Sequence, residues 1–252
     1  MAWIDSAPLF LVGLAFFLIM LIGIEIGYRA WRWLRAKDGG SGGHEFLLTA
    51  ALGLLSLLLG FTFSLALSRY DARRTLAVQE ANAIGSMWLR AQLLRDPDKS
   101  RMSDLVRRYV DARIAWSQAA SRAADLAPTQ ALQGQIWAVT GDVMRTEPSQ
   151  PLARGLMDAV SQGFDLQAAR TAARKAQIPT RVLDILVLYS VLSMMLLGSV
   201  LAAKGQRHYG ATAVLLVLLT LALILILELD QPRTGAIQVS QQPLLDVKAS
   251  MR

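Results

Sequence analysis

An uninterrupted stretch from Phe46 to Leu94 sets how this chain can fold. Its first part, Phe46–Leu67, is apolar enough to cross a membrane, whereas Ser68–Leu94 is as polar as a soluble helix. No proline interrupts the stretch, and no helix stop signal separates its two parts. We therefore predict a single helix of roughly 50 residues, about 75 Å long, of which about 30 Å would lie in lipid.

One face of this predicted helix carries small and polar residues. At about 100° per residue, positions three and four residues apart fall within a narrow arc. We call this arc the small-residue face; it consists of Thr49, Gly53, Ser56, Gly60, Ser64, Leu67, Asp71, Val78, Asn82 and Gly85. The arc either lines a pore or symmetric interface, or packs against another helix, because small residues let membrane helices approach closely. Spacing alone favours close packing.

The composition indicates a membrane protein with a modest soluble part. Hydrophobic residues make up 54% of the chain and charged residues only 18%, below the usual quarter. The chain has no cysteine, which excludes disulfides and thiolate metal sites. The net charge of +7 is expected to report membrane orientation rather than nucleic-acid binding.

Four apolar segments predict an all-α protein with four transmembrane helices, at residues 8–28, 46–67, 182–203 and 210–229. Residues 1–67 would hold the first two spans, 68–181 a helical extramembrane domain, and 182–230 the last two spans. Turn signals divide the extramembrane domain into helices at Ser100–Leu126, Thr129–Arg145 and Leu152–Gln177. The tail, residues 231–252, is too apolar to be free and is expected to dock on the soluble helices.

Charges in the short loops predict the orientation. Arg29–Lys37 and Lys204–His208 together hold six Lys and Arg residues, while the N-terminal segment holds none. The positive-inside rule places such loops in the cytoplasm. The termini and the helical domain would then be periplasmic, in the inner membrane of a Gram-negative bacterium. Against this, six basic residues cluster at the membrane edge of the helical domain, which are Arg69, Arg73, Arg74, Arg174, Lys175 and Arg181.

The sequence shows no pattern typical of catalysis. His44 and His208 are the only histidines and lie far apart, and no nucleophile elbow, zinc motif or phosphate-binding loop is present. We therefore predict no enzyme activity, no cofactor and no metal site. The run Ser68–Arg74 is either a solvated turn of helix or a charged vestibule that attracts anions.

Two segments carry a family resemblance. LLGFTFSLALSRYDARRTLAVQEANAIGS (Leu58–Ser86) and ELDQPRTGAIQVSQQPLL (Glu228–Leu245) resemble the bacterial bestrophin-like domain family. The chain is also similar, more distantly, to true bestrophins, through Leu59-Gly60-Phe61, Arg69-Tyr70 and Asp71-Ala72-Arg73. In layout the resemblance covers nearly the whole chain.

The resemblance implies a pentameric ion channel, mostly for anions such as chloride, with four spans per subunit and a pore lined by the long helix. Pore-lining residues would be Thr49, Ser56, Gly60 and Ser64, with Phe61 or Phe63 as a hydrophobic constriction. Polar residues at the pore mouth or between subunits would be Arg69, Asp71, Arg73, Arg74, Glu80 and Asn82. The partners implied are membrane lipids, further copies of the chain and inorganic ions.

The chain also departs from bestrophins. Its soluble part is shorter, no acidic cluster matches their calcium clasp, and bestrophins keep their soluble part in the cytoplasm. The alternative hypothesis is a non-conducting membrane scaffold or sensor whose helical domain binds a partner.

Overall fold

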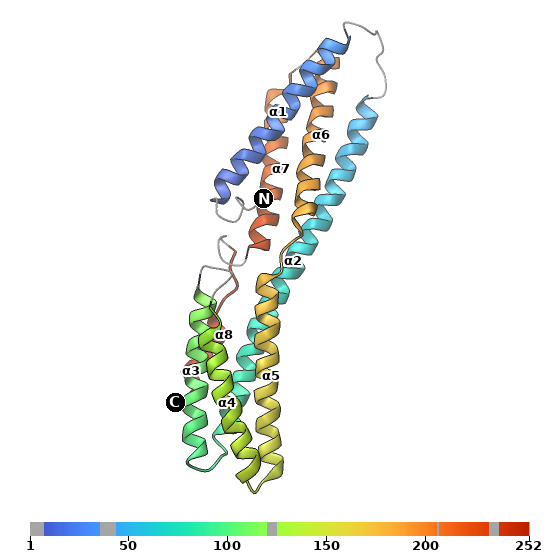
Figure 1. Ribbon diagram of the computed structural model, residues 1–252. Coiled ribbons are helices and arrows are strands. Elements are labelled where there is room, and N and C mark those ends of the chain that lie inside the picture. The colour runs from blue at the N-terminus through green and yellow to red at the C-terminus, as the bar shows by residue number, and fades with distance from the viewer. Residues whose placement is uncertain (1–7, 36–43, 120–124, 206, 232–236, 252) are drawn as a thin grey trace. The chain divides into compact units, whose positions relative to one another are not determined.

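The computed structural model describes residues 8–35, 44–119, 125–205, 207–231 and 237–251. These residues form helices and contain no strand (Figure 1). The helices are α1 (Leu9–Arg35), α2 (His44–Ala91), α3 (Asp98–Gln118), α4 (Ala127–Thr146), α5 (Gln150–Lys175), α6 (Thr180–Lys204), α7 (Tyr209–Asp230) and α8 (Gln242–Ser250). Within the described residues, four apolar stretches are long enough to cross a membrane, in α1, α2, α6 and α7. The predicted all-α class with four spans is confirmed.

The chain divides into two compact units. The span unit comprises Met1–Ser68 and Gln177–Gln231, and the helical unit comprises Arg69–Ala176 and Pro232–Arg252. Helix α2 contributes to both, because its 48 residues continue without a break across the boundary after Ser68.

Several helix ends differ from those predicted. Helix α1 continues through Arg35, so most of the predicted loop Arg29–Lys37 is helical, since no glycine or proline interrupts it. Helix α3 ends at Gln118 rather than Leu126, because Ala119 takes an extended conformation. Lys37 and the glycine-rich residues 39–43 that follow it lie outside the described residues.

In the span unit, α1 packs closely against α6 (Figure 1). Glycines allow this approach: a Cβ at Gly27 would overlap the carbonyl group of Met195, and a Cβ at Gly198 would overlap the carbonyl group of Ile24. We call this contact the glycine seam. At the far end of the unit, the amide of Ile178 donates to the Asp230 carboxylate at 3.0 Å, which joins the end of α7 to the start of α6.

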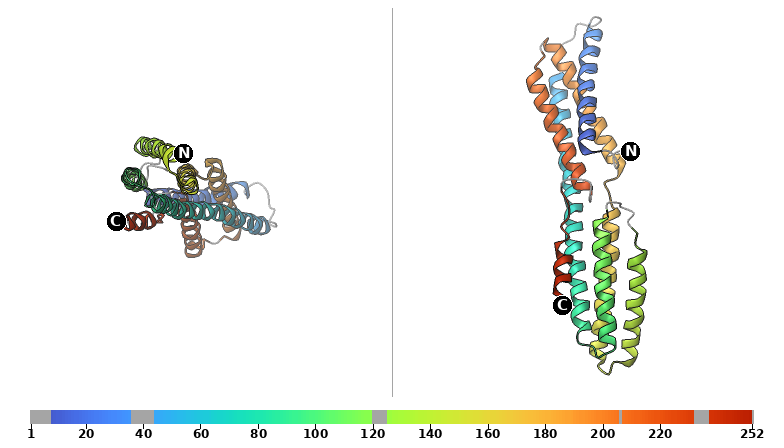
Figure 2. Two further views of the ribbon diagram at one scale, coloured as in Figure 1. Left: turned by 90° about the horizontal axis from the view of Figure 1, so that it is seen from below. Right: turned by 90° about the vertical axis from the view of Figure 1, so that its left-hand side faces the viewer.

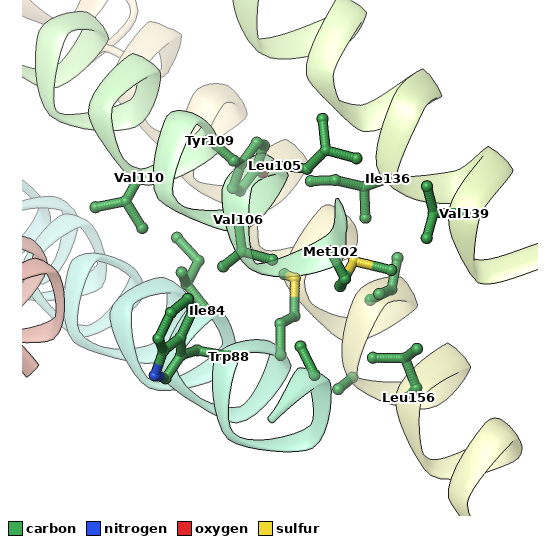
Figure 3. Packing of buried hydrophobic residues seen from close by; sticks show 14 of the residues in the cluster. Ile84, Trp88, Met102, Leu105, Val106, Tyr109, Val110, Ile136, Val139 and Leu156 are labelled. Carbon is green, nitrogen blue, oxygen red and sulfur yellow. The ribbon is translucent and has the colours of Figure 1, made fainter. Parts of the chain in front are cut away.

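In the helical unit, α3, α4 and α5 run side by side, as the views in Figures 1 and 2 show. Their apolar faces meet the second half of α2 in one buried cluster, in which Ile84, Met102, Ile136 and Leu156 are almost completely inaccessible (Figure 3). Such close packing of apolar side chains is the main stabilising contribution to a small helical domain.

Helix α8, near the end of the chain, belongs to the same unit. Its Leu244 and the following Met251 are buried in the apolar cluster. Lys248 Nζ pairs with Asp111 Oδ1 at 2.6 Å, and Arg107 Nε donates to the carbonyl oxygen of Met251 at 3.3 Å. The last part of the chain is thus held against α3 by both apolar and polar contacts.

Candidate functional site

The small-residue face of α2 is uncovered in the protomer. Every member of this face is exposed except Gly85, which is half-buried. In the apolar part of α2 only 11% of residues are buried, against 33% in α1 and 22% in α7. Of these three spans, the one in α2 therefore has the largest share of surface available for contacts outside its own chain.

The glycines of this face have open space before them. No atom of the described residues lies within 4 Å of a Cβ placed at Gly53 or Gly60. The glycines of the α1–α6 seam, in contrast, would collide with backbone atoms if they carried a Cβ. Within the protomer, the small-residue face is therefore not a packing seam.

The opposite face of α2 is the covered one. Its buried positions include Leu55, Thr62 and Ala66 in the span unit and Arg73 and Glu80 in the helical unit. At about 100° per residue these positions lie roughly half a turn from the small-residue face. One helix thus presents a covered face and an uncovered face along its whole length.

Hydroxyl groups on the small-residue face bond to their own helix. Thr49 Oγ1 donates to the carbonyl oxygen of Glu45 at 3.0 Å, and Ser56 Oγ donates to that of Gly53 at 2.7 Å. Each hydroxyl hydrogen is thereby used, while the oxygen keeps lone pairs that can accept. These positions can therefore offer acceptor oxygens to water or to cations, whereas contact with an anion would require the hydroxyl hydrogen to turn away from the helix.

The two phenylalanines proposed as a constriction differ in placement. Phe61 is 67% exposed and Phe63 37% exposed. By helical spacing, Phe63 lies beside Ser56 at the edge of the small-residue face, whereas Phe61 lies about 60° beyond the other edge. Phe63 is therefore the better candidate for narrowing a passage along this face.

The polar residues predicted for the pore mouth fall into two groups. Asp71, Arg74 and Asn82 are exposed, and Arg69 is half-buried. Arg73 and Glu80 are buried inside the protomer. Within the protomer, the last two side chains are covered by the other helices of the helical unit.

Glu80 is the centre of a buried ionic network. Its Oε1 accepts from Arg113 Nε of α3 at 2.6 Å, and its Oε2 pairs with Arg170 Nη1 of α5. Both Glu80 and Arg113 are fully inaccessible. Burial raises the pKa of the nearby Tyr109 phenol well above its usual value, and the negative charge of Glu80 adds to this. The network ties three helices of the unit together.

Comparison with known proteins identifies the family. The model of the bestrophin-like domain matches residues 10–244, which is nearly the whole chain.

The chain belongs to the bestrophin-like family.

Solved structures agree with this assignment at the level of the fold. A crystal structure of a bacterial bestrophin homolog from Klebsiella pneumoniae matches with a TM-score of 0.65 and 17% identity, covering 94% of this chain and 98% of the other. A point variant of a bacterial bestrophin homolog from the same organism matches with a TM-score of 0.67 and 16% identity, covering 97% and 96%. Among curated proteins, no sequence match was found.

This bestrophin-like chain contains three arginines that are almost completely buried, Arg113, Arg170 and Arg174. Sequence reasoning named Arg174 only as a basic residue at the membrane edge, and it did not single out Arg113 or Arg170. A signal was present: Arg113 occupies a helical position between the apolar residues Tyr109, Val110 and Ile114, where a solvated residue would not be expected. Within the described residues, no group of three or more His, Cys, Asp or Glu side chains could hold a metal ion.

Proposed function

We propose that this chain forms a homo-oligomeric ion channel in which the small-residue faces of α2 surround a central axis. The observation that carries the proposal is the contrast in coverage: the small-residue face is exposed, while Gly27 of α1 and Gly198 of α6 are each buried against the backbone of the facing helix. A single transmembrane helix facing lipid has no physical use for small and polar residues on one side.

Five subunits would surround the axis by analogy with bestrophins. Thr49, Ser56, Gly60 and Ser64 would line the passage, and their exposure in the protomer supports this arrangement. Phe63 would narrow the passage, since an aromatic ring repeated around an axis forms a hydrophobic constriction.

Anions are the favoured ions, by the resemblance to bestrophins and by the exposed Arg74 where α2 leaves the span unit. Asp71 is also exposed there. Repeated around an axis, the two rings would act in opposite directions on the local potential. The reversal potential across a KCl gradient measures the balance, and a reversal at the potassium potential would contradict anion preference.

Conduction is tested by recording from purified protein in planar bilayers. Ser64→Trp would place a large ring on the small-residue face of every subunit and should reduce the current at least tenfold. The matched control is Leu218→Trp, which changes an exposed apolar residue of α7 and should leave the current unchanged. Absence of current from the unmodified protein under all voltages, salts and pH values would instead support a non-conducting scaffold or sensor.

The inner membrane of a bacterium is the proposed location, with the helical unit and both termini in the periplasm. The positive charges of the short loops support this orientation, although Arg207 and Lys204 pair with Glu25 and Glu45. The chain is free of cysteine, so Ser100→Cys would provide a single labelling site. It should react with an impermeant maleimide in cells with a permeabilised outer membrane, and reaction only after lysis would reverse the orientation.

A further inference from the structure

The helical unit contains a cavity of about 40 Å³ on the covered side of α2. It is lined by three arginines, Arg73 of α2 and Arg170 and Arg174 of α5, together with Trp116 and Ser117 of α3 and Gln241 ahead of α8. We infer that this cavity is a binding site for a small inorganic anion, of which a halide is the best fit.

Positive charge converges on the cavity. Three guanidinium groups gather around the single ring of Trp116, with their central carbons 4.1 Å (Arg113), 4.5 Å (Arg174) and 5.6 Å (Arg170) from the ring centroid. All three arginines are at least nine-tenths buried. Like charges repel more strongly in a poorly solvated interior than in water, and the Glu80 carboxylate, which pairs with Arg113 and Arg170, supplies one negative charge against these three positive ones. A bound anion would lower the remaining repulsion.

Arg113 shows that this charge is not fully satisfied by hydrogen bonds. Its Nε donates to Glu80, but among the described residues Nη1 and Nη2 are buried without a hydrogen-bond partner. Arg113 does not itself line the cavity; its guanidinium group lies against the ring of Trp116, which does. It therefore contributes a fixed positive potential to the site rather than a direct contact.

The lining arginines are held in place before any anion arrives. Arg174 Nη1 donates to the carbonyl oxygen of Trp116 at 2.7 Å, and its Nη2 donates to that of Ala119. Arg170 bonds to both Glu80 and Gln241. Because these bonds fix the guanidinium groups, a bound anion would meet ordered donors, which lowers the entropic cost of binding.

The size of the cavity selects among anions. A cavity of about 40 Å³ is larger than the roughly 10–15 Å³ that one water molecule requires, but it has room for only a few water molecules or one small ion. The ring of Trp116 and the side chain of Val239 supply apolar wall. A compact, weakly hydrated ion such as bromide or chloride meets both conditions, whereas a nucleotide is too large for the cavity itself.

Anomalous diffraction from crystals of the full-length protein grown in sodium bromide tests the site directly. We expect a bromide peak within contact distance of the Arg73, Arg170 or Arg174 guanidinium group. A cavity without a peak, in crystals that show ordered bromide elsewhere, would overturn the inference. The measurement uses unmodified protein, so it does not depend on the folding of a variant.

A matched pair of variants tests the role of charge in solution. The thermal unfolding midpoint of the detergent-solubilised protein should rise with sodium bromide relative to sodium gluconate at equal ionic strength. Arg73→Gln should increase at least tenfold the bromide concentration that gives half of this rise in the midpoint, because a charge-assisted contact is lost. Arg108→Gln, which removes an exposed arginine of α3, should leave it unchanged.

Equal effects of the two variants would indicate general screening and would overturn the inference. These experiments measure binding and not current, so their result is independent of the test of conduction. Current without bromide binding would indicate a channel that lacks this anion site. Bromide binding without current would indicate an anion site in a protein that does not conduct.

Discussion

The glycine seam between α1 and α6 and the small-residue face of α2 have similar sequences and opposite surroundings. In the seam, Gly27 and Gly198 lie so close to the facing backbone that no Cβ could fit. On α2, Gly53 and Gly60 have at least 4 Å of open space at the same position among the described residues. Small residues in a membrane helix therefore indicate a face with a special neighbour, but they do not say whether that neighbour is a helix of the same chain.

The same contrast continues along α2 in the helical unit. Glu80 is fully buried and pairs with two arginines, whereas Asn82, two residues further on, is exposed on the small-residue face. Two polar residues that look equivalent in the sequence thus have different environments, because residues two apart on a helix point in different directions.

The largest loss of stability is expected on the covered face of α2. Glu80→Gln would leave the buried Arg113 and Arg170 without their counter-charge, so it should lower the free energy of unfolding by about 3–5 kcal/mol and the unfolding midpoint by roughly 10 °C. Asn82→Ala, on the uncovered face, should change the free energy by less than about 0.5 kcal/mol. Thermal unfolding of both variants measures the difference, and equal effects would show that the two faces of α2 do not differ in burial.

A somewhat smaller loss is expected in the seam. Gly198→Ala would force α6 away from the backbone of α1 at Ile24, and overpacking of this kind costs about 3 kcal/mol. Gly60→Ala adds the same methyl group in open space, where alanine is the better helix former by about 1 kcal/mol. Unfolding in detergent should show the first variant destabilised and the second unchanged or slightly stabilised; the reverse order would show that the seam is looser than its geometry indicates.

The smallest change in stability is expected for Gly60→Leu, which places a large side chain on the uncovered face of α2. If the face lines an open axis, the larger side chain should leave the oligomer intact, with a stability change below about 0.5 kcal/mol per subunit, and should reduce the current. Size-exclusion chromatography with light scattering measures the oligomer. Dissociation into protomers would show instead that the face packs tightly between subunits, as the seam packs within one.

Part of the candidate site could be predicted from the sequence. The arc from Thr49 to Asn82 follows from helical spacing alone, and all its residues between these two are exposed as one face. The places of Arg73 and Glu80 could not be predicted in the same way. Both were expected at a pore mouth or between subunits with Asp71 and Arg74, but in the protomer Glu80 pairs with Arg113 and Arg170 and Arg73 lines a cavity with two arginines of α5.

By itself, the sequence determined the four spans, the single long helix and the family, because hydropathy, helical period and motif are properties of consecutive residues. The tertiary structure decided which face of that helix is covered, and that Arg113, Arg170 and Arg174 gather around Trp116. Coverage depends on what lies opposite a residue in space, and the residues that surround Trp116 come from segments far apart in the chain.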